Sequence, residues 1–166
     1  RSANYSSIFP DQLNEFTQFA MTSVQSFSQI YSMYYGDVSG NFINIRKTAN
    51  TFIVRTILNS PTRRSITEET LDMDGNLLKT ETNIQSDYDP RKRPWYTGSL
   101  SESIGNWTNV YIFHSNKRPG ITYALPLFSK DNQRLGVFGT DLQLGEISLF
   151  LNSQKKGSVT DLIVIN

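Results

Sequence analysis

The chain is organised around residues 88–96, which read Tyr-Asp-Pro-Arg-Lys-Arg-Pro-Trp-Tyr. Asp89-Pro90 opens a turn, because a residue before proline is pushed out of the helical region. Pro94 suits the first position of a helix, where its missing N–H is not needed and its φ is already right. The pattern therefore predicts a loop that enters a short helix over residues 95–100. Free backbone N–H groups at that helix start, beside Arg93, would attract a carboxylate.

Arg93 has two interpretations. Its planar guanidinium could grip a carboxylate with two parallel charge-assisted bonds, which lysine cannot copy. It could equally be a solvated surface residue beside Arg91 and Lys92. If Trp95 and Tyr96 are buried aromatic walls, they hold Arg93 close to them, which argues against a fully exposed position. The residues alone leave both interpretations open.

The composition narrows the classes of protein. A length of 166 residues is typical of one domain. The formal net charge is +1, with 16 basic and 15 acidic residues, so the chain has no global electrostatic footprint for nucleic acid. It has no cysteine and a single histidine, His114, which argues against disulfides, thiolate chemistry and a histidine-built metal centre. We expect no nucleic-acid partner, no metal and no cofactor.

Enzyme signatures are also missing from the sequence. A Ser-His-Asp site would have to use His114, and no serine lies in a Gly-x-Ser-x-Gly elbow. No glycine-rich phosphate loop is present. No apolar run approaches the roughly 20 residues needed to cross a bilayer. We therefore expect a binding module rather than an enzyme.

Hydrophobic periodicity predicts the elements of the first half. Apolar residues at spacings of three and four predict a helix over about residues 10–28. These residues are Leu13, Phe16, Ala20, Val24 and Phe27. Apolar, β-branched or alternating segments predict strands over residues 30–35, 41–46, 51–58, 65–73 and 77–82. Asp74-Gly75-Asn76 marks a hairpin turn between the last two strands.

In the second half, strands are predicted over residues 109–114, 121–127 and 134–141. Arg118-Pro119-Gly120 is expected to form a turn between the first two of them. A closing amphipathic helix is predicted over residues 142–152. The last residues, 159–166, have the pattern of a further strand and suggest that the natural chain continues. Helices that flank a run of antiparallel strands predict an α+β fold.

Asp141 is the second candidate charge. Period-two geometry places it on the same strand face as Leu135 and Val137, where a carboxylate is expensive unless a cation or several donors meet it. A ligand ammonium is one such cation. The alternative is a helix N-cap at the strand-to-helix junction, with Thr140 and Gln143 forming a capping box. The residues alone favour the cap slightly.

Taken together, these motifs resemble a Cache domain. Residues 88–96, Tyr111, residues 121–127 and residues 135–141 are similar to the membrane-distal, PAS-like half of a double Cache (dCache) sensor. The resemblance implies a PAS-like fold, with a central antiparallel sheet, a long N-terminal helix and short flanking helices. It also implies that residues 1–155 form the membrane-distal subdomain.

The same resemblance implies that residues 156–166 begin a membrane-proximal segment. Such families are extracytoplasmic ligand sensors between two transmembrane helices of chemoreceptors, histidine kinases, or cyclases and phosphodiesterases of nucleotide signalling. The resemblance thus implies a membrane-anchored full-length protein, with this domain in the periplasm or outside the cell. A homodimer through the N-terminal helix is one arrangement that fits such a receptor.

One branch of these sensors binds free amino acids or related amines. By resemblance, Arg93 and Trp95 would hold the ligand carboxylate, and Asp141 with a tyrosine would face the ammonium. The site residues expected from the resemblance and from candidate tyrosine hydroxyls are Tyr88, Arg93, Trp95, Tyr96, Tyr111, Tyr123 and Asp141. A zwitterion would satisfy both charges at once. A sensor for another small carboxylate or metabolite, and a structural module that binds no ligand, are the alternatives.

Overall fold

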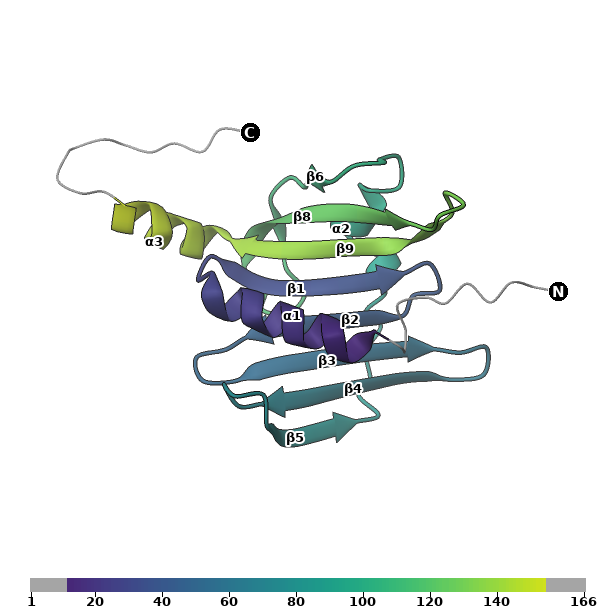
Figure 1. Ribbon diagram of the computed structural model, residues 1–166, viewed down its shortest axis with the longest axis horizontal. Coiled ribbons are helices and arrows are strands. Elements are labelled where there is room, and N and C mark those ends of the chain that lie inside the picture. Colours follow the sequence, from purple (N-terminus) through teal and green to yellow (C-terminus); the bar gives the residue numbers. More distant parts are fainter. Residues whose placement is uncertain (1–11, 155–166) are drawn as a thin grey trace.

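A computed structural model describes residues 12–154, and its strands form one antiparallel sheet (Figure 1). The sheet has nine strands in the order β5-β4-β3-β2-β1-β9-β8-β6, with β7 also paired to β8. Helix α1 lies along one face of this sheet (Figure 1). The α+β prediction, with an antiparallel sheet and few helices, is confirmed.

The first five strands follow one another as neighbours and confirm the predicted order. They are β1 (Ile30–Asp37), β2 (Phe42–Lys47), β3 (Phe52–Asn59), β4 (Arg64–Leu71) and β5 (Leu77–Thr82). The predicted hairpin turn between β4 and β5 is also confirmed. Gly75 adopts a φ of +88°, and the Asp72 carboxylate accepts hydrogen bonds from the backbone N–H groups of Asp74 and Asn76.

The second half departs from the prediction at its start. Its strands are β6 (Asn106–Trp107), β7 (Tyr111–Ile112), β8 (Pro119–Phe128) and β9 (Arg134–Gln143). Of the predicted strand over residues 109–114, only β7 pairs with a neighbouring strand. The side chains of Tyr111 and Phe113 alternate with their neighbours because they line a pocket that this segment covers. The predicted turn at Arg118-Pro119-Gly120 is wrong. The chain turns at residues 114–116, where the N–H of Lys117 bonds to the carbonyl of Phe113.

The helices are α1 (Leu13–Ser26), α2 (Pro94–Thr97) and α3 (Leu144–Gln154), with the 3₁₀ turn η1 (Pro90–Lys92) before α2. Pro94 begins α2 as predicted, but this helix is a single turn and ends before residue 100. Asp89 caps η1 by accepting a hydrogen bond from the N–H of Arg91. The strand expected over residues 159–166, and the segment expected to begin at residue 156, lie outside the described residues.

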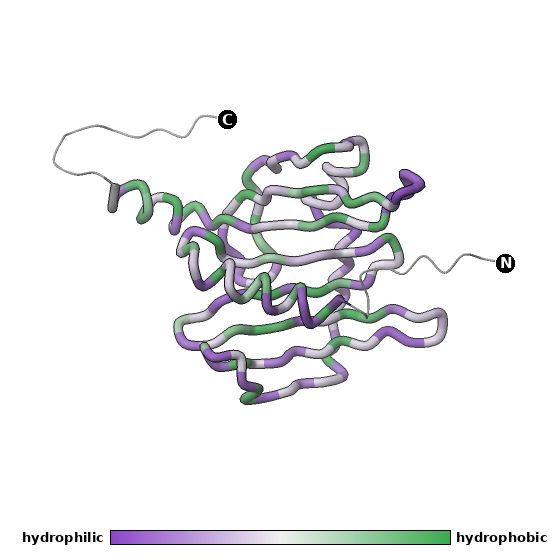
Figure 2. Tube along the Cα trace, viewed as in Figure 1, coloured by the Kyte–Doolittle hydropathy of each residue, from purple (hydrophilic) through white to green (hydrophobic). Residues whose placement is uncertain are grey.

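On the α1 face of the sheet the core is apolar. Helix α1 packs against β1 and β2, and the hydrophobic residues gather on the central strands, whereas β4 and β5 are mostly hydrophilic (Figure 2). The buried members of this cluster are Ala20, Met21, Val24, Met33, Tyr35, Ile43, Ile45, Phe52 and Val54. Removing this apolar surface from water is the main source of stability on this face.

The opposite face is covered by the long connection between β5 and β8. Its buried cluster is Tyr34, Phe42, Ile57, Ile66, Trp95, Tyr96, Ala124 and Val137. Trp95 of α2 lies directly over Gly36 of β1, where an added Cβ would come within 3.0 Å of the indole. Glycine at this position therefore lets α2 approach the sheet closely. Successive residues of one strand point to opposite faces, so the same strands contribute side chains to both clusters.

Candidate ligand-binding site

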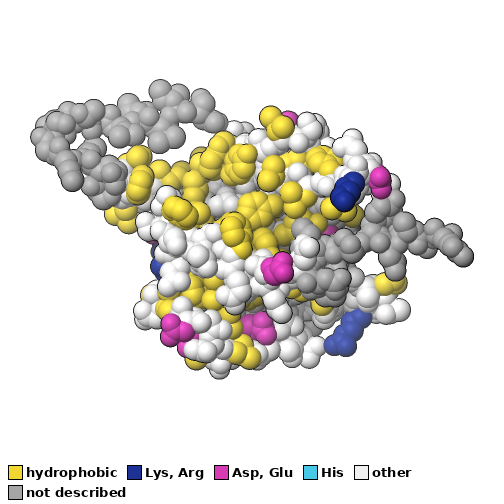
Figure 3. Space-filling model, in the orientation of Figure 1, with side chains coloured by type: hydrophobic (Ala, Val, Ile, Leu, Met, Phe, Trp, Pro, Cys, Tyr) yellow, Lys and Arg dark blue, Asp and Glu magenta, His cyan; other side chains and the backbone are white. Residues whose placement is uncertain are grey.

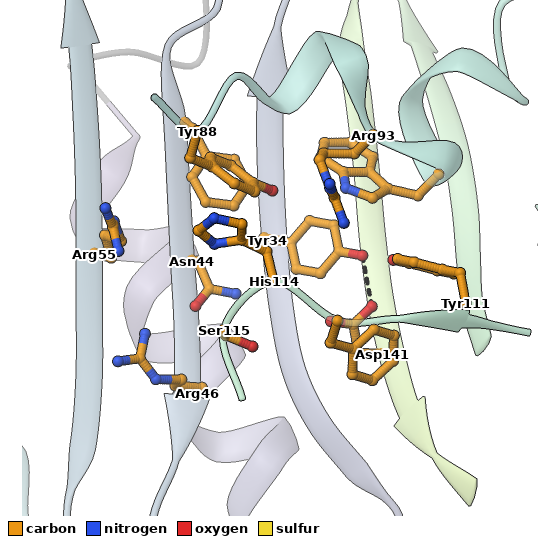
Figure 4. A pocket seen from close by; sticks show the side chains of 13 residues that line it. Tyr34, Asn44, Arg46, Arg55, Tyr88, Arg93, Tyr111, His114, Ser115 and Asp141 are labelled. Atoms are coloured by element: carbon orange, nitrogen blue, oxygen red, sulfur yellow. Dashed lines mark hydrogen bonds between the residues drawn. The ribbon is translucent and has the colours of Figure 1, made fainter. Parts of the chain in front are cut away.

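A pocket lies between the sheet and the connection that covers it (Figure 4). It encloses about 480 Å³, a volume that includes its open mouth. The residues that line it are Tyr34, Phe42, Asn44, Arg46, Arg55, Tyr88, Arg93, Trp95, Tyr111, Phe113, His114, Ser115 and Asp141.

The antiparallel register sets the floor of the pocket. Tyr34 of β1 pairs with Asn44 of β2 on one side and with Gly139 of β9 on the other. A Cβ at Gly139 would overlap the Tyr34 ring, so glycine lets this ring lie across β9. Side chains opposite one another in register share one face of the sheet. Two cross-strand rows result, Arg55–Asn44–Tyr34–Gly139 and Arg46–Ser32–Asp141–Thr122.

Asp141 is held by three hydroxyl groups and is only 6% exposed. Tyr34 donates to Oδ1 over 2.6 Å, Thr122 donates to Oδ1 over 2.5 Å, and Ser32 donates to Oδ2 over 2.9 Å. The Thr122 hydroxyl has a single hydrogen, so in its 2.7 Å contact with Tyr111 the phenol must be the donor. The hydroxyls therefore form a directed network that ends on the carboxylate.

This geometry shows that the helix-cap interpretation of Asp141 is wrong. Strand β9 continues through Thr140 and Asp141 to Gln143, and α3 begins only at Leu144. The strand conformation continues to Gln143 because this residue still pairs with Gly120 of β8. Pairing on both sides overrides the local capping signal, and the side chain of Asp141 faces the pocket.

Burial raises the pKa of the Asp141 carboxyl to about 6, although its hydroxyl donors act in the opposite direction. At neutral pH it is therefore ionised, but it forms no ion pair within residues 12–154. Burial also raises the pKa values of Tyr34, Tyr88 and Tyr111, so these phenols stay neutral. The pocket thus contains one buried anion that makes no salt bridge with a described side chain, although the Arg93 guanidinium also acts to lower its pKa.

Arg93 lines the pocket, and its guanidinium points toward the Tyr34 and Asp141 side (Figure 4). Within residues 12–154 the guanidinium makes one hydrogen bond, to the carbonyl of Ile112, and this bond is long at 3.4 Å. It lies 5.9 Å from the ring centroid of Tyr88 and makes no ion pair within the described part of the chain. Arg93 is thus a half-buried residue of the pocket wall, and most donors of its guanidinium have no acceptor among the described residues.

The predicted anion site at the helix start is reduced to this side chain. Helix α2 has only four residues, so it has little macrodipole. The backbone N–H groups of Tyr96 and Thr97 both bond to the carbonyl of Arg93. Two of the N–H groups at the helix start are therefore already bonded, and carboxylate recognition at this end of the pocket would depend chiefly on the Arg93 guanidinium.

Aromatic rings complete the wall beside Arg93. Trp95 is 2% exposed, and its ring centroid lies 4.8 Å from that of Tyr34. Tyr88 lies between Phe42, at 5.1 Å, and His114, at 4.9 Å. Of the predicted site residues, Tyr88, Arg93, Trp95, Tyr111 and Asp141 are brought together here.

Tyr96 and Tyr123 are not among the residues that line the pocket. Tyr96 is buried beside Trp95, and the charges that act on its hydroxyl belong to Asp37, Arg134 and Arg91, outside the pocket. Tyr123 packs against Trp107, with ring centroids 5.2 Å apart. Strand alternation explains this position, because Thr122 faces the pocket and its neighbour must face the other side.

Sequence reasoning missed the residues that the sheet contributes. Tyr34, Asn44, Arg46 and Arg55 line the pocket from β1, β2 and β3, and Thr122 orders its hydroxyl network. One feature of the sequence could have identified these residues: polar or charged side chains occur at alternate positions within otherwise apolar strands. Arg46 and Arg55 fit that signal, but their common face depends on a cross-strand register that the sequence does not state.

Other kinds of site find no support in the described residues. No group of three or more His, Asp and Glu side chains between residues 12 and 154 is arranged to hold a metal ion. In the same part of the chain, none of the helices has the length and apolar character to span a bilayer.

Known proteins with similar sequences are bacterial chemoreceptors. McpG of Pseudomonas putida, a methyl-accepting chemotaxis protein, is 27% identical over 92 residues, which cover 55% of this chain and 14% of McpG. PctB of Pseudomonas aeruginosa is 32% identical over 78 residues, or 47% of this chain and 12% of PctB. The matched stretches thus span a small part of these receptors.

Solved structures show the same fold. The ligand-binding domain of the Campylobacter jejuni chemoreceptor Tlp3, in complex with 4-methylisoleucine, has a TM-score of 0.57 at 19% identity over 94% of this chain. The ligand-binding domain of PctB, in complex with L-Gln, has a TM-score of 0.54 at 19% identity over 90% of this chain. The chain spans 50% and 47% of those two domains. The PAS-like Cache fold is confirmed by these structures.

The family is identified by a match over residues 47–149 to the methyl-accepting chemotaxis protein-like, first PDC sensor domain. This range includes β3 to β9, all of α2 and the pocket residues Arg55, Arg93 and Asp141, whereas the pocket residues of β1 and β2 precede it. Because the match covers more than half of the chain, the protein belongs to the family of first PDC sensor domains of methyl-accepting chemotaxis protein-like receptors.

Proposed function

We propose that this sensor domain binds a free α-amino acid in the pocket between Arg93 and Asp141. The observation that carries the proposal is that a guanidinium and a buried carboxylate face one pocket, each without an ionic partner among residues 12–154. A zwitterion supplies the opposite charge to both. The ligand carboxylate would bind Arg93, and the ligand ammonium would bind Asp141 beside the hydroxyl of Tyr111.

The electrostatics support this assignment. A buried charge without a partner costs several kcal/mol, so a ligand that pairs with the buried Asp141 and also with the half-buried Arg93 favours the bound state. The Asp141 carboxylate already accepts three hydroxyl hydrogen bonds, which hold it in place for a further donor. Binding would then favour a conformation in which the connection closes over the sheet. The complexes of Tlp3 with 4-methylisoleucine and of PctB with L-Gln agree with an amino-acid ligand.

The direct test is a thermal-shift screen of the 166-residue chain against the common amino acids, amines and small carboxylates. A ligand at a hundred times its dissociation constant should add about 2.7 kcal/mol of stability. Arg93→Ala should abolish the shift, because the ligand carboxylate loses its bidentate partner. Lys92→Ala, an exposed cation in the same loop, is the matched control and should bind normally. If no amino acid stabilises the protein, the proposal is wrong.

A second variant separates an amino-acid sensor from a sensor of simple carboxylates. Asp141→Asn removes the anion that faces the ammonium but leaves Arg93 in place. We expect it to weaken amino-acid binding far more than binding of a carboxylate that has no amino group. Equal effects on the two classes of ligand would instead favour a carboxylate sensor.

In the full-length receptor, we propose that this domain lies outside the cytoplasm of a membrane-anchored protein. Residues 1–155 would be its membrane-distal part, and residues 156–166 would lead into the next segment. It would act by binding rather than by catalysis. Hydrophobic side chains gather on the face of the sheet that carries α1 (Figure 3), and on or next to this helix Phe19 and Phe27 are more than half exposed. A homodimer through α1 would cover them.

A further inference from the structure

We propose that the amino acid bound here carries a negatively charged side chain, and that Arg46 and Arg55 receive that charge. The preferred ligand is then a dicarboxylic amino acid of about the size of glutamate. This inference rests on the proposed function, because it assigns the part of the same pocket that Arg93 and Asp141 leave unused.

The two arginines lie on the opposite side of the pocket from Asp141. Arg46 of β2 and Arg55 of β3 line one side, and Asp141 of β9 lines the other, with Tyr34 of β1 between them (Figure 4). Arg46 and Asp141 are both register partners of Ser32, so they stand in one row across the sheet. Strands β2 and β9 are two strand spacings apart, or about 10 Å. A ligand whose ammonium meets Asp141 can therefore extend its side chain along this row toward the arginines.

The charges around the pocket do not balance when an ordinary zwitterion binds. Arg46, Arg55 and Arg93 contribute three positive charges to the wall, and Asp141 contributes one negative charge. Glu68 adds a second negative charge by contacting both Arg46 and Arg55. Three cations against two anions leave one positive charge, and a neutral zwitterion does not change this total. A ligand with an anionic side chain brings the total to zero.

The shared contact with Glu68 leaves both arginines incompletely paired. The guanidinium nitrogens of Arg46 and Arg55 lie 3.5 Å from the Glu68 carboxylate, each bonded to a different oxygen. Charge-assisted hydrogen bonds are normally about 2.7–2.9 Å long, so each of these contacts is loose. One carboxylate therefore holds two guanidinium groups in position without saturating either of them.

Arg55 also has a donor with no acceptor. Its Nε is buried and has no hydrogen-bond partner among the described residues. Buried polar groups nearly always have such a partner, so an unpaired donor in a pocket wall points to an acceptor that arrives with the ligand. Asn44, the register partner of Arg55, adds a side-chain amide to the same wall.

Other side chains fit this end of the pocket less well. An apolar side chain would remove water from two guanidinium groups without replacing their hydrogen bonds. A basic side chain would be repelled by them. His114 does not change this argument, because burial and the nearby Lys117, Arg93 and Arg55 lower the pKa of its imidazole, which is therefore neutral at neutral pH. The aromatic rings of the pocket suit the methylene groups of a glutamate-sized ligand.

The test is a comparison of isosteric ligands by isothermal titration calorimetry on the 166-residue chain near neutral pH. L-Glutamate and L-glutamine have the same shape and differ in side-chain charge. We expect L-glutamate to bind about tenfold more tightly or better. L-Aspartate and L-asparagine form a second pair for a shorter side chain. This comparison needs no variant, so it does not depend on whether a mutated protein folds.

Variants then assign the effect to the two arginines. Arg55→Gln and Arg46→Gln should each weaken L-glutamate binding about tenfold and leave L-glutamine binding nearly unchanged. Lys47→Gln is the matched control, because it removes the same charge from the same strand as Arg46, and strand alternation turns it away from the pocket. Glu68→Gln should increase the preference for L-glutamate, because it removes the anion that competes for both arginines.

The outcomes separate this inference from the proposed function. If L-glutamine binds as tightly as L-glutamate, or if both arginine variants weaken the two ligands equally, the assignment of an acidic side chain is wrong and amino-acid sensing stands. If no amino acid binds, both proposals fail.

Discussion

On the α1 face of the sheet the buried side chains are apolar, whereas the opposite face carries an ionised carboxylate and three arginines around one pocket. Both faces are built by the same strands. In β2, Ile43 and Ile45 join the apolar cluster while Asn44 and Arg46 line the pocket. The comparison indicates that the α1 face serves burial alone, whereas the opposite face combines a buried, largely aromatic cluster with polar groups held in place for a ligand.

The two faces of the sheet also stabilise their buried side chains in different ways. Apolar side chains need only close packing, which the α1 face provides with a single helix. The buried Asp141 needs hydrogen-bond donors, and it receives three of them from two other strands, Ser32 and Tyr34 from β1 and Thr122 from β8. A site of this kind is specific because each donor must be in register. Such a site also lowers the stability of the folded protein, because burial disfavours the charged carboxylate and raises the pKa of Asp141 to about 6.

The largest expected effect is on the apolar face. Phe52 is fully buried in the α1 cluster, so Phe52→Ala should destabilise the domain by about 3–5 kcal/mol through lost burial and the cavity left behind. Urea unfolding monitored by circular dichroism measures this loss. Ligand affinity of the folded fraction should stay the same.

Asp141→Asn is the opposite case and tests the division between the faces. It should weaken amino-acid binding strongly and leave the stability at pH 7 unchanged or higher. If it destabilised the protein as much as Phe52→Ala, the pocket face would contribute to stability in the same way as the α1 face.

An intermediate effect is expected from Ser32→Ala. The Ser32 hydroxyl donates to Oδ2 of Asp141, and a hydrogen bond to a charged group contributes about 1.5–3 kcal/mol. Loss of this donor should raise the pKa of Asp141 further, because hydroxyl donors favour the ionised form. The loss of stability should therefore be larger at pH 7 than at pH 5, where the carboxyl is mostly protonated. Urea titrations at both pH values measure it, and equal losses would contradict the prediction.

The smallest expected effect is the pH dependence of the unaltered domain. The pKa of Asp141 is raised in the folded state, so its contribution to stability is fully present below about pH 4 and is lost as the pH rises through about 6. From pH 7 to pH 5, this group should therefore stabilise the ligand-free domain by about 1 kcal/mol.

Ligand binding should have the opposite pH dependence. The ammonium of the ligand needs the ionised carboxylate, so affinity should fall about tenfold from pH 7 to pH 5. L-Glutamine is the suitable probe, because its own charges do not titrate in this range. His114 and Arg93 also face the pocket, so Asp141→Asn serves as the reference, and both pH slopes should flatten in it. A slope that survives in this variant would assign the effect to another group, His114 first.

Much of the local structure could be predicted from the sequence. The turn at Gly75, the start of α2 at Pro94 and the order of the first five strands all depend on residues close together in the chain. Such signals are local because they arise from backbone dihedral preferences and from the period of apolar residues. The importance of residues 88–96 was visible for the same reason, whereas the residues alone left open whether Arg93 faces a pocket or the solvent.

The environment of Asp141 could be predicted only in part. Period two placed it on an apolar strand face and required several donors or a cation. The sequence did not say which donors, and its local signal favoured a helix cap. Ser32 and Tyr34 lie 109 and 107 positions away in the chain, and only the pairing of β1 with β9 brings them to the carboxylate.

The sequence therefore predicted most of the elements, the class of fold and two candidate charges, Arg93 and Asp141. The tertiary structure decided which other side chains join them: Tyr34 and Thr122 beside Asp141, Arg46 and Arg55 at the far end, and Tyr123 turned away. The physical reason is register. Shifting one strand by a single residue would turn its side chains to the other face, so a site built across several strands exists only once their pairing is fixed.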